Sequence, residues 1–297
     1  MNAIDPFARA AFIPEFADFS AFREHSVGLT GARGLLGSIL MARLERQGIA
    51  VAAYPGDIND EATVAAWFEQ QRCSHFFHFA AMVPVGLVEG NPLLAFQTNV
   101  IGAFNICKHL LRTQPHCWLF HCSSSHVYQP TARPTPIAED SPTHPPTFYG
   151  ATKLAAERVI DTLLAKLQAP YCIGRVFSFT HARQAVPYLV PSLRQKIAAL
   201  PDGATLELDN PSAVRDIQDA EQVIDVILQL ARRTVTGTVN IGTGIGSSVG
   251  DIARSLALAL GRTISVAGVD RGAPGALVAD TTRLRALLAA VETAGGR

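Results

Sequence analysis

A short apolar strand runs directly into three spaced glycines and then into a helix, and this feature restricts the fold most. The strand is expected over residues 25–29 and the helix continues to about residue 47. Gly31 permits a tight turn, Gly34 lets a pyrophosphate approach the backbone, and Gly37 lets the helix pack closely on a sheet. The N–H groups at the start of that helix attract phosphate. The stretch therefore predicts a dinucleotide-binding unit.

The same alternation of strand and helix continues through the first two thirds of the chain. Further strands are expected at residues 49–53, 74–79, 116–122 and 170–176, and helices at 61–71, 92–112 and 149–168. After residue 177 the elements are shorter, with helices at 187–200, 219–232 and 249–260 and strands at 205–208 and 238–241. This order predicts an α/β fold, a Rossmann-type doubly wound parallel sheet with a smaller C-terminal substrate-binding region.

The expected division of the chain follows from these elements. Residues 1–24 form an N-terminal extension, and residues 25–176 form the NAD(P)-binding domain, to which residues 217–242 return. Residues 177–216 and 243–297 form the substrate-binding region. In the extension, Phe12, Phe16, Phe19 and Phe22 have a partly helical spacing. We interpret them as a strap that packs on the main domain, with a subunit contact as the alternative.

Composition removes several classes of function. The net charge is zero, which argues against a nucleic-acid or membrane-surface partner. No apolar run is long enough to span a bilayer, and residues 1–22 lack the pattern of a signal peptide. The five cysteines have no C-x-x-C spacing and are interpreted as small core residues. A reduced, cytoplasmic protein without a metal site is expected.

Tyr149 and Lys153 are the strongest candidates for chemistry. In a helix, residues four apart lie on one face about one turn apart. A nearby ammonium group stabilises a phenolate and lowers the pKa of the phenol. Tyr149 is therefore predicted to donate or accept a proton near neutral pH. The strand at 116–122 brings a second hydroxyl group to the same sheet edge, in the segment Ser123-Ser124-Ser125-His126.

Two features favour NADP(H) over NAD(H) as the cofactor. An NAD site usually places Asp or Glu at the end of the second strand, but here Tyr54-Pro55-Gly56 follows that strand. Arg33 lies within the glycine turn, where a guanidinium group suits the 2′-phosphate of NADP. The alternative is that Arg33 is a solvated loop residue.

With these residues in place, the chain resembles an extended short-chain dehydrogenase/reductase of the nucleotide-sugar epimerase, dehydratase and reductase type. The resemblance covers roughly residues 26–290. Its motifs appear in the family's order: Thr30-Gly31-x-x-Gly34-x-x-Gly37, Gly56-Asp57-Ile58, His78-Phe79-Ala80-Ala81, Asn99-Val100-x-Gly102, Ser123-Ser124-Ser125-His126-Val127-Tyr128, Tyr149-x-x-x-Lys153, Arg215-Asp216-Ile217-x-Asp219-Ala220 and Asn240-Ile241-Gly242-x-Gly244.

The resemblance implies a role for each matching position. Counting back from Val127 identifies Ser124 as the catalytic hydroxyl beside Tyr149 and Lys153, while Ser123 and Ser125 have the alternative of local hydrogen bonding. The implied cofactor-binding residues are Gly31, Arg33, Gly34, Leu35, Leu36, Gly37, Asp57, Ile58, Ala80, Ala81, Asn99, Tyr149 and Lys153. The implied substrate-binding residues are Ser124, Ser125, His126, Ser178 and Arg215, with a surface ion pair as the alternative for Arg215.

Three departures from the family pattern reduce the number of reactions that this chain is expected to catalyse. Sugar dehydratases carry an acidic pair after the catalytic hydroxyl, whereas Ser125 and His126 stand there in this chain, which argues against a 4,6-dehydratase. Ser178 replaces an Asn that usually contacts phosphate. The short link between strands two and three and Arg33 are more like family reductases that use NADPH.

Three functions therefore remain. The first is NADP(H)-dependent 4-keto reduction of a nucleotide-linked deoxysugar, the second is a nucleotide-sugar epimerase with tightly held NAD, and the third is a non-catalytic NAD(P)-sensing protein. The intact Ser124, Tyr149 and Lys153 set places the third last. The resemblance also implies a homodimer formed through the helices at 92–112 and 149–168.

Overall fold

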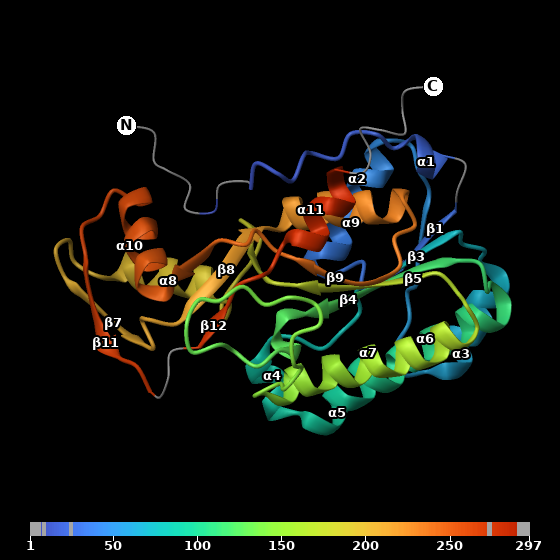
Figure 1. Ribbon diagram of the computed structural model, residues 1–297, viewed down its shortest axis with the longest axis horizontal. Coiled ribbons are helices and arrows are strands. Elements are labelled where there is room, and N and C mark those ends of the chain that lie inside the picture. The colour runs from blue at the N-terminus through green and yellow to red at the C-terminus, as the bar shows by residue number, and fades with distance from the viewer. Residues whose placement is uncertain (1–6, 8–9, 24–25, 272–274, 290–297) are drawn as a thin grey trace.

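The main sheet lies between two layers of helices, with a smaller lobe at one side (Figure 1). A computed structural model describes residues 7, 10–23, 26–271 and 275–289. The expected first strand begins at residue 25, which lies outside the described residues, and so do parts of the extension at 1–24 and of the region at 243–297. No helix among the described residues is long and apolar enough to cross a membrane.

All neighbouring strands of the main sheet run parallel, and the predicted fold class is confirmed. The order is β2 (Val51–Ala53), β1 (Val27–Thr30), β3 (His75–His78), β4 (Trp118–Ser124), β5 (Tyr171–Val176) and β9 (Gly237–Ile241). The direction of winding reverses between β1 and β3, so a ligand cleft is expected there, at the carboxyl ends of the strands. A single helix, α3 (Glu61–Gln70), joins β2 to β3, and the Asp60 side chain caps it.

Strand residues alternate between the two helix layers. Phe77, Trp118 and Phe120 face α2 (Leu35–Arg46), α9 (Ala220–Arg232) and α11 (Thr282–Ala289). Phe76, Leu119 and Ile173 face α3, α6 (Ala103–Thr113) and α7 (Phe148–Lys166). Both faces of the sheet are therefore buried, as a parallel sheet requires.

The helix expected at 92–112 is interrupted. It consists of α5 (Pro92–Phe96), a π-helical turn (Gln97–Gly102) and α6, and the short helix α4 (Val85–Gly90) precedes it. A Cβ atom on Gly102 would lie 2.5 Å from Cδ1 of Ile58, so glycine lets the Ile58 loop approach this turn. π-Helical turns often occur at functional sites. Hydrophobic periodicity alone does not reveal this turn.

The smaller lobe has its own apolar core between α8 (Leu189–Ala199) and α10 (Val249–Ala259). Beside them β7 (Thr205–Asp209) pairs with β11 (Ser265–Val269). A second small sheet contains β6 (Ser178–Thr180), β8 (Val214–Asp219), β10 (Gly246–Ser248) and β12 (Ala276–Leu277). The sequence did not predict β6, β8, β10, β11, β12, α4 or α11, because most of these segments are too short to show a clear period.

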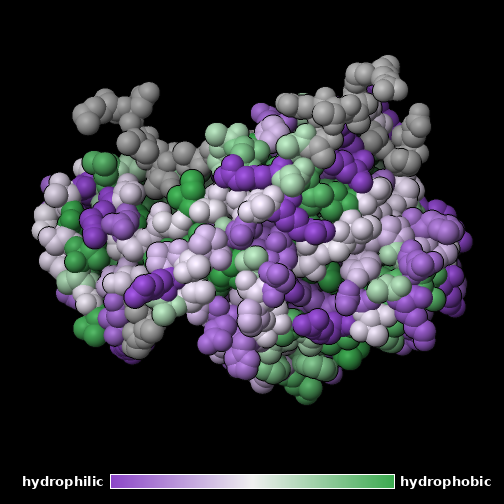
Figure 2. Space-filling model, in the orientation of Figure 1, coloured by the Kyte–Doolittle hydropathy of each residue, from purple (hydrophilic) through white to green (hydrophobic). Residues whose placement is uncertain are grey.

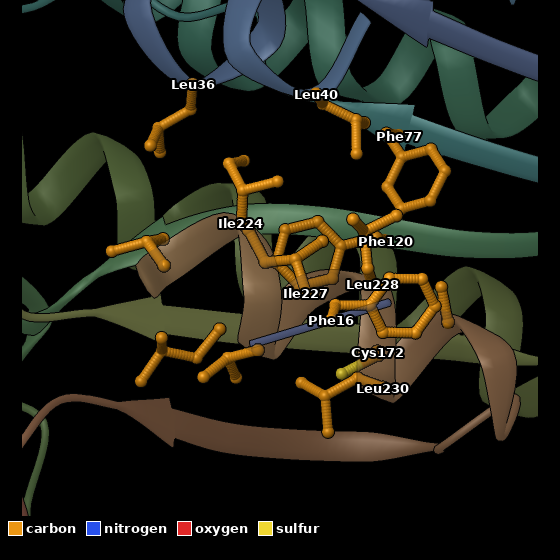
Figure 3. Packing of buried hydrophobic residues seen from close by; sticks show 14 of the residues in the cluster. Phe16, Leu36, Leu40, Phe77, Phe120, Cys172, Ile224, Ile227, Leu228 and Leu230 are labelled. Carbon is orange, nitrogen blue, oxygen red and sulfur yellow. The ribbon is translucent and has the colours of Figure 1, made fainter. Parts of the chain in front are cut away.

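Residues 10–23, which we call the strap, cross the outer side of α9 and end in the short helix α1 (Ser20–Arg23). Phe16, Phe19 and Phe22 belong to the main apolar core, and Figure 3 shows Phe16 among Ile227, Leu228 and other side chains of that core. Polar side chains of α9 bind the strap backbone, since Asp225 accepts a hydrogen bond from the Phe16 N–H (2.9 Å). The prediction of an aromatic strap on the main domain is confirmed.

Candidate active site

A cavity of about 1330 Å³ opens at the carboxyl ends of the main strands and reaches the smaller lobe. It lies where the winding of the sheet reverses, which is the usual ligand position in such folds. All but one of the predicted site residues line it: Gly31, Arg33, Gly34, Leu35, Leu36, Gly37, Asp57, Ile58, Ala80, Ala81, Ser124, Ser125, His126, Tyr149, Lys153, Ser178 and Arg215.

Asn99 is the exception, because its side chain is buried beside the cavity instead of lining it. Its Oδ1 accepts a hydrogen bond from the Met82 N–H (2.6 Å), and its Nδ2 donates to Thr152 Oγ1 (3.0 Å). Asn99 thus ties the cavity wall after β3 to helix α7. The predicted contact of Asn99 with a cofactor stays a prediction, and in this structure the side chain holds the cavity wall in place.

The glycine turn fits a pyrophosphate. Gly31 has a φ of 77°, in the region that favours glycine. A Cβ on Gly37 would collide with the Gly31 carbonyl oxygen, so glycine is required for the close approach. Helix α2 starts at Gly34 with no side-chain cap, which leaves its first N–H groups available to a ligand.

The end of β2 carries no carboxylate. Tyr54 stands there, and its hydroxyl group donates to the Asp57 carbonyl oxygen (3.0 Å) and lies 2.7 Å from Thr63 Oγ1. Arg33 is exposed at the cavity and makes no ion pair with any described residue. The cavity therefore has a guanidinium group without an ion-pair partner among the described residues, and it has no carboxylate at the end of β2 to bind a ribose.

Ser124, Tyr149 and Lys153 all line the cavity. Ser124 ends β4, its Oγ accepts a hydrogen bond from the His126 N–H (3.2 Å), and its hydroxyl group is close enough to Tyr149 to affect the pKa of the phenol. Tyr149 lies in the first turn of α7, which Thr147 caps through the Gly150 N–H (3.2 Å). A Cβ on Gly150 would collide with the His126 carbonyl oxygen, so glycine lets α7 press against the segment that follows β4.

The pKa values in this centre differ from the sequence-based expectation. Burial raises the pKa of Tyr149, and the Ser124 hydrogen bond only partly opposes that rise. Burial also lowers the pKa of Lys153. In the free protein the pKa of Tyr149 is therefore raised, and not lowered as the sequence predicted, because desolvation of the phenolate outweighs the Ser124 hydrogen bond and the nearby Cys122 and Tyr188 raise the pKa further. Tyr149 therefore holds its proton at neutral pH.

Ser123 and Ser125 do not compete with Ser124. Ser123 donates to Glu157, whose Oε2 pairs with Arg175 Nη2 at 2.8 Å, and Arg175 in turn binds the Tyr128 hydroxyl group (2.8 Å). Ser125 is almost fully buried, and its carbonyl oxygen accepts from the Tyr128 N–H. The buried network fixes the backbone after β4, and all three serines reach the cavity wall.

His126 and Arg215 both line the cavity and lie close to each other. The rings of His126 and Tyr149 meet edge to face, with centroids 5.5 Å apart. Burial, and then the charge of Arg215, lower the pKa of His126 to about 4, so the imidazole is neutral at pH 7. Arg215 Nη1 donates to the carbonyl oxygens of Val214 and Gly275 (2.8 Å each), and no described carboxylate pairs with it.

Sequence reasoning missed the loop after β6. Arg183, Gln184 and Tyr188 line the cavity from this loop, and the Val186–Pro187 peptide bond within it is cis. No motif marked these residues, and their proximity to the centre arises only because β6 pairs with β8. Among the described residues, no group of acidic, histidine or cysteine side chains is arranged to hold a metal ion.

Comparisons with known proteins define the class. The profile of the family described as GDP-mannose 4,6 dehydratase matches residues 41–284. The chain therefore belongs to the extended short-chain dehydrogenase/reductase family of NAD(P)-dependent nucleotide-sugar epimerases, dehydratases and reductases, as its motifs predicted.

Individual relatives differ in their reactions. A UDP-glucose 4-epimerase from Halalkalibacterium halodurans is 24% identical over 299 residues, which cover 88% of this chain and 88% of that protein. A dTDP-4-dehydrorhamnose reductase from Streptomyces griseus is 35% identical over 141 residues, or 46% of this chain and 45% of that protein. The solved structure of RMD from Pseudomonas aeruginosa complexed with NADPH has a TM-score of 0.79 at 20% identity, covering 89% of this chain and 92% of that one. At this identity the likeness to RMD concerns the fold.

Proposed function

We propose that the protein is an NADP(H)-dependent reductase that converts the 4-keto group of a nucleotide-linked deoxysugar into an alcohol. The observation that carries the proposal is that the Tyr149 phenol lines one cavity together with Ser124, Lys153 and the glycine turn, and burial favours its protonated form. Reduction of a ketone needs a proton donor at the carbonyl oxygen, and a protonated phenol is ready to serve. The bound dinucleotide would supply the hydride.

Each catalytic residue then has one task. Ser124 donates a hydrogen bond to the carbonyl oxygen and stabilises its developing charge, a contribution of roughly 3 kcal/mol for one well-placed donor. Tyr149 transfers its proton to the same oxygen, and the Lys153 ammonium stabilises the phenolate that remains. The glycine turn would hold the pyrophosphate of the cofactor, Arg33 its 2′-phosphate, and Lys153 also its nicotinamide ribose.

The substrate class follows from charge at the other end of the cavity. Arg215 is largely desolvated, which lowers its pKa, and it has no carboxylate partner among the described residues. A diphosphate would satisfy this cation. Arg183 lines the same cavity and adds a second positive charge. Both features suit a nucleoside diphosphate linked to a sugar.

The second candidate is a nucleotide-sugar epimerase with tightly held NAD. The similarity to a UDP-glucose 4-epimerase over 88% of both chains favours it. A non-catalytic NAD(P) sensor ranks third, because Ser124, Tyr149 and Lys153 are all present and line one cavity.

One experiment separates the three. One sample of the purified protein is denatured, and any nucleotide that it releases is identified. A second, native sample is tested for oxidation of NADPH with a dTDP- or UDP-linked 4-keto-6-deoxyhexose. An empty protein that oxidises NADPH with this ketone supports the reductase. Stoichiometric NAD release with no NADPH oxidation favours the epimerase. An empty protein that binds neither dinucleotide removes both enzymatic assignments.

Arg33 provides the test of cofactor choice. Loss of a charged hydrogen bond costs about 1.5–3 kcal/mol, so Arg33→Ala is expected to weaken NADPH binding by roughly 10- to 100-fold and NADH binding by less than about twofold. The matched control is Arg183→Ala, which removes another exposed arginine of the same cavity and should leave the ratio of the two affinities unchanged. Fluorescence titration measures both constants, and equal losses for the two cofactors in Arg33→Ala would refute the NADP assignment.

We also propose a homodimer formed through the helices on the α7 side of the sheet. Apolar side chains are exposed on α4, α5 and the π-helical turn, including Leu93, which is 71% exposed, and Leu87, Leu94, Phe96 and Ile101. Figure 2 shows this apolar surface at the lower edge of the molecule, over α5. Light scattering is expected to give twice the chain mass, and Leu93→Glu should shift the protein toward the monomer. A wild-type monomer at micromolar concentration contradicts the proposal.

A cytoplasmic location completes the proposal. The five cysteines of the chain are free thiols, and four of them are buried. Such cysteines behave as small apolar residues and need no oxidising compartment.

A further inference from the structure

His126 lines the cavity near both Tyr149 and Arg215. Its N–H bonds Ser124 Oγ (3.2 Å), and Gly150 of α7 packs against its carbonyl group. Its ring lies edge to face on Tyr149, at 5.5 Å between centroids, and Arg215 is close enough to affect its charge. Among the described residues, no hydrogen bond or ion pair occupies either ring nitrogen. A nitrogen lone pair is therefore free at the cavity wall.

We propose that His126 is a second catalytic residue, a base that removes a proton from the carbon next to the substrate ketone held by Ser124 and Tyr149. This inference rests on the proposed function, because it requires a bound 4-keto sugar. The imidazole nitrogen forms the new N–H bond, the C–H electron pair becomes a carbon–carbon double bond, and the carbonyl π pair moves to oxygen. Ser124 and Tyr149 donate hydrogen bonds to that enolate oxygen. Return of the proton to carbon restores the ketone, so no oxidant or reductant is consumed.

The charge of a bound substrate is expected to increase the basicity of His126. In the free protein, burial and then the Arg215 charge lower the pKa of the imidazole to about 4. A substrate diphosphate against Arg215 offsets that positive charge, and the imidazolium becomes less costly. His126 is thus a weak base in the free protein and a stronger one in the substrate complex.

The neighbouring residue limits the outcome to proton exchange. Elimination of a hydroxyl group needs an acid at the leaving oxygen, and the residue beside His126 in the cavity lining is Ser125, whose hydroxyl group is not an acid of useful strength near neutral pH. Proton removal by His126 is therefore expected to lead to exchange of the carbon-bound hydrogen with solvent, without loss of water from the sugar.

Deuterium exchange tests the inference separately from reduction. The wild-type protein is incubated in D₂O with NADP⁺, which fills the cofactor site without reducing the ketone, and with the dTDP- or UDP-linked 4-keto-6-deoxyhexose that it reduces. NMR and mass spectrometry then follow deuterium entering the carbons beside the ketone. Exchange well above a protein-free control is expected. In His126→Phe, which keeps the ring but removes both nitrogens, the ratio of the exchange rate to the NADPH-dependent reduction rate should fall by roughly 100-fold or more.

The control is His116→Phe, the same substitution at an exposed position just before the amino end of the same strand, β4. It should keep the wild-type ratio, and NADPH titration of each variant verifies an intact cofactor site. Reduction by the wild type without exchange overturns the role of His126 and leaves the reductase standing. Exchange that persists at the wild-type ratio in His126→Phe also overturns it. If the wild type neither reduces either ketone nor exchanges its hydrogen, both the proposed function and this inference are overturned.

Discussion

Replacing Tyr149 with phenylalanine is expected to lower kcat by roughly 1000-fold while leaving NADPH affinity within about twofold of wild type. The loss corresponds to removal of a general acid, which contributes about 10²- to 10⁴-fold to a rate. The phenyl ring keeps the contact with His126, so the cavity should retain its shape. Single-turnover NADPH oxidation with a nucleotide-linked 4-keto sugar measures the chemical step, and fluorescence titration measures the cofactor.

Tyr188→Phe is the matched control, because it removes a second phenolic hydroxyl group from the same cavity. Tyr188 lies at the start of α8 and has no hydrogen bond to Ser124 among the described residues. We expect a loss of less than about tenfold for this variant, well below the range for a general acid. Full turnover by Tyr149→Phe would show that another group delivers the proton.

Phe22→Ala is expected to lower the free energy of unfolding by about 3–5 kcal/mol, the usual cost of truncating a buried phenylalanine. Phe22 is fully buried in the strap and contacts the rings of Phe16 and His75, at 6.0 and 5.4 Å between centroids. Its removal leaves a cavity between the strap and the amino end of β3. Urea denaturation measures the change, with the midpoint falling and the slope unchanged.

The comparison is Leu258→Ala on α10, where 68% of the leucine is exposed. Its unfolding free energy should stay within about 0.5 kcal/mol of wild type, as is usual at the surface. If Phe22→Ala changed the free energy of unfolding as little as Leu258→Ala, the strap would contribute little to stability despite its burial.

Local backbone constraints explain what the sequence predicted well. Gly31, Gly34 and Gly37 satisfy requirements that arise within one strand, one turn and one helix, so their spacing alone identified the unit. The spacing of Tyr149 and Lys153 likewise depends only on helix geometry. Their position beside Ser124 followed from the rule that parallel strands bring their carboxyl ends to one edge.

Features that depend on distant residues were not predictable in this way. The raised pKa of Tyr149 reflects how much of the cavity wall surrounds it, which no short motif encodes. Asn99 matches its motif, yet its partners Met82 and Thr152 lie on segments far away in the sequence. The small sheet around β8 is built from strands as short as β12, whose two residues are stabilised by pairing and not by propensity.

The position of β9 at the edge of the main sheet has a consequence for synthesis on the ribosome. β5 pairs with β9, and the strap binds α9. During synthesis, β5 and the strap therefore have no partner until β9 and α9 have been made. Until residue 241 has emerged, a nascent chain carries an open strand edge and uncovered phenylalanines. Such intermediates aggregate readily, so the yield of folded protein in a cell should depend on chaperone capacity and on growth temperature more strongly than the stability of the finished molecule does.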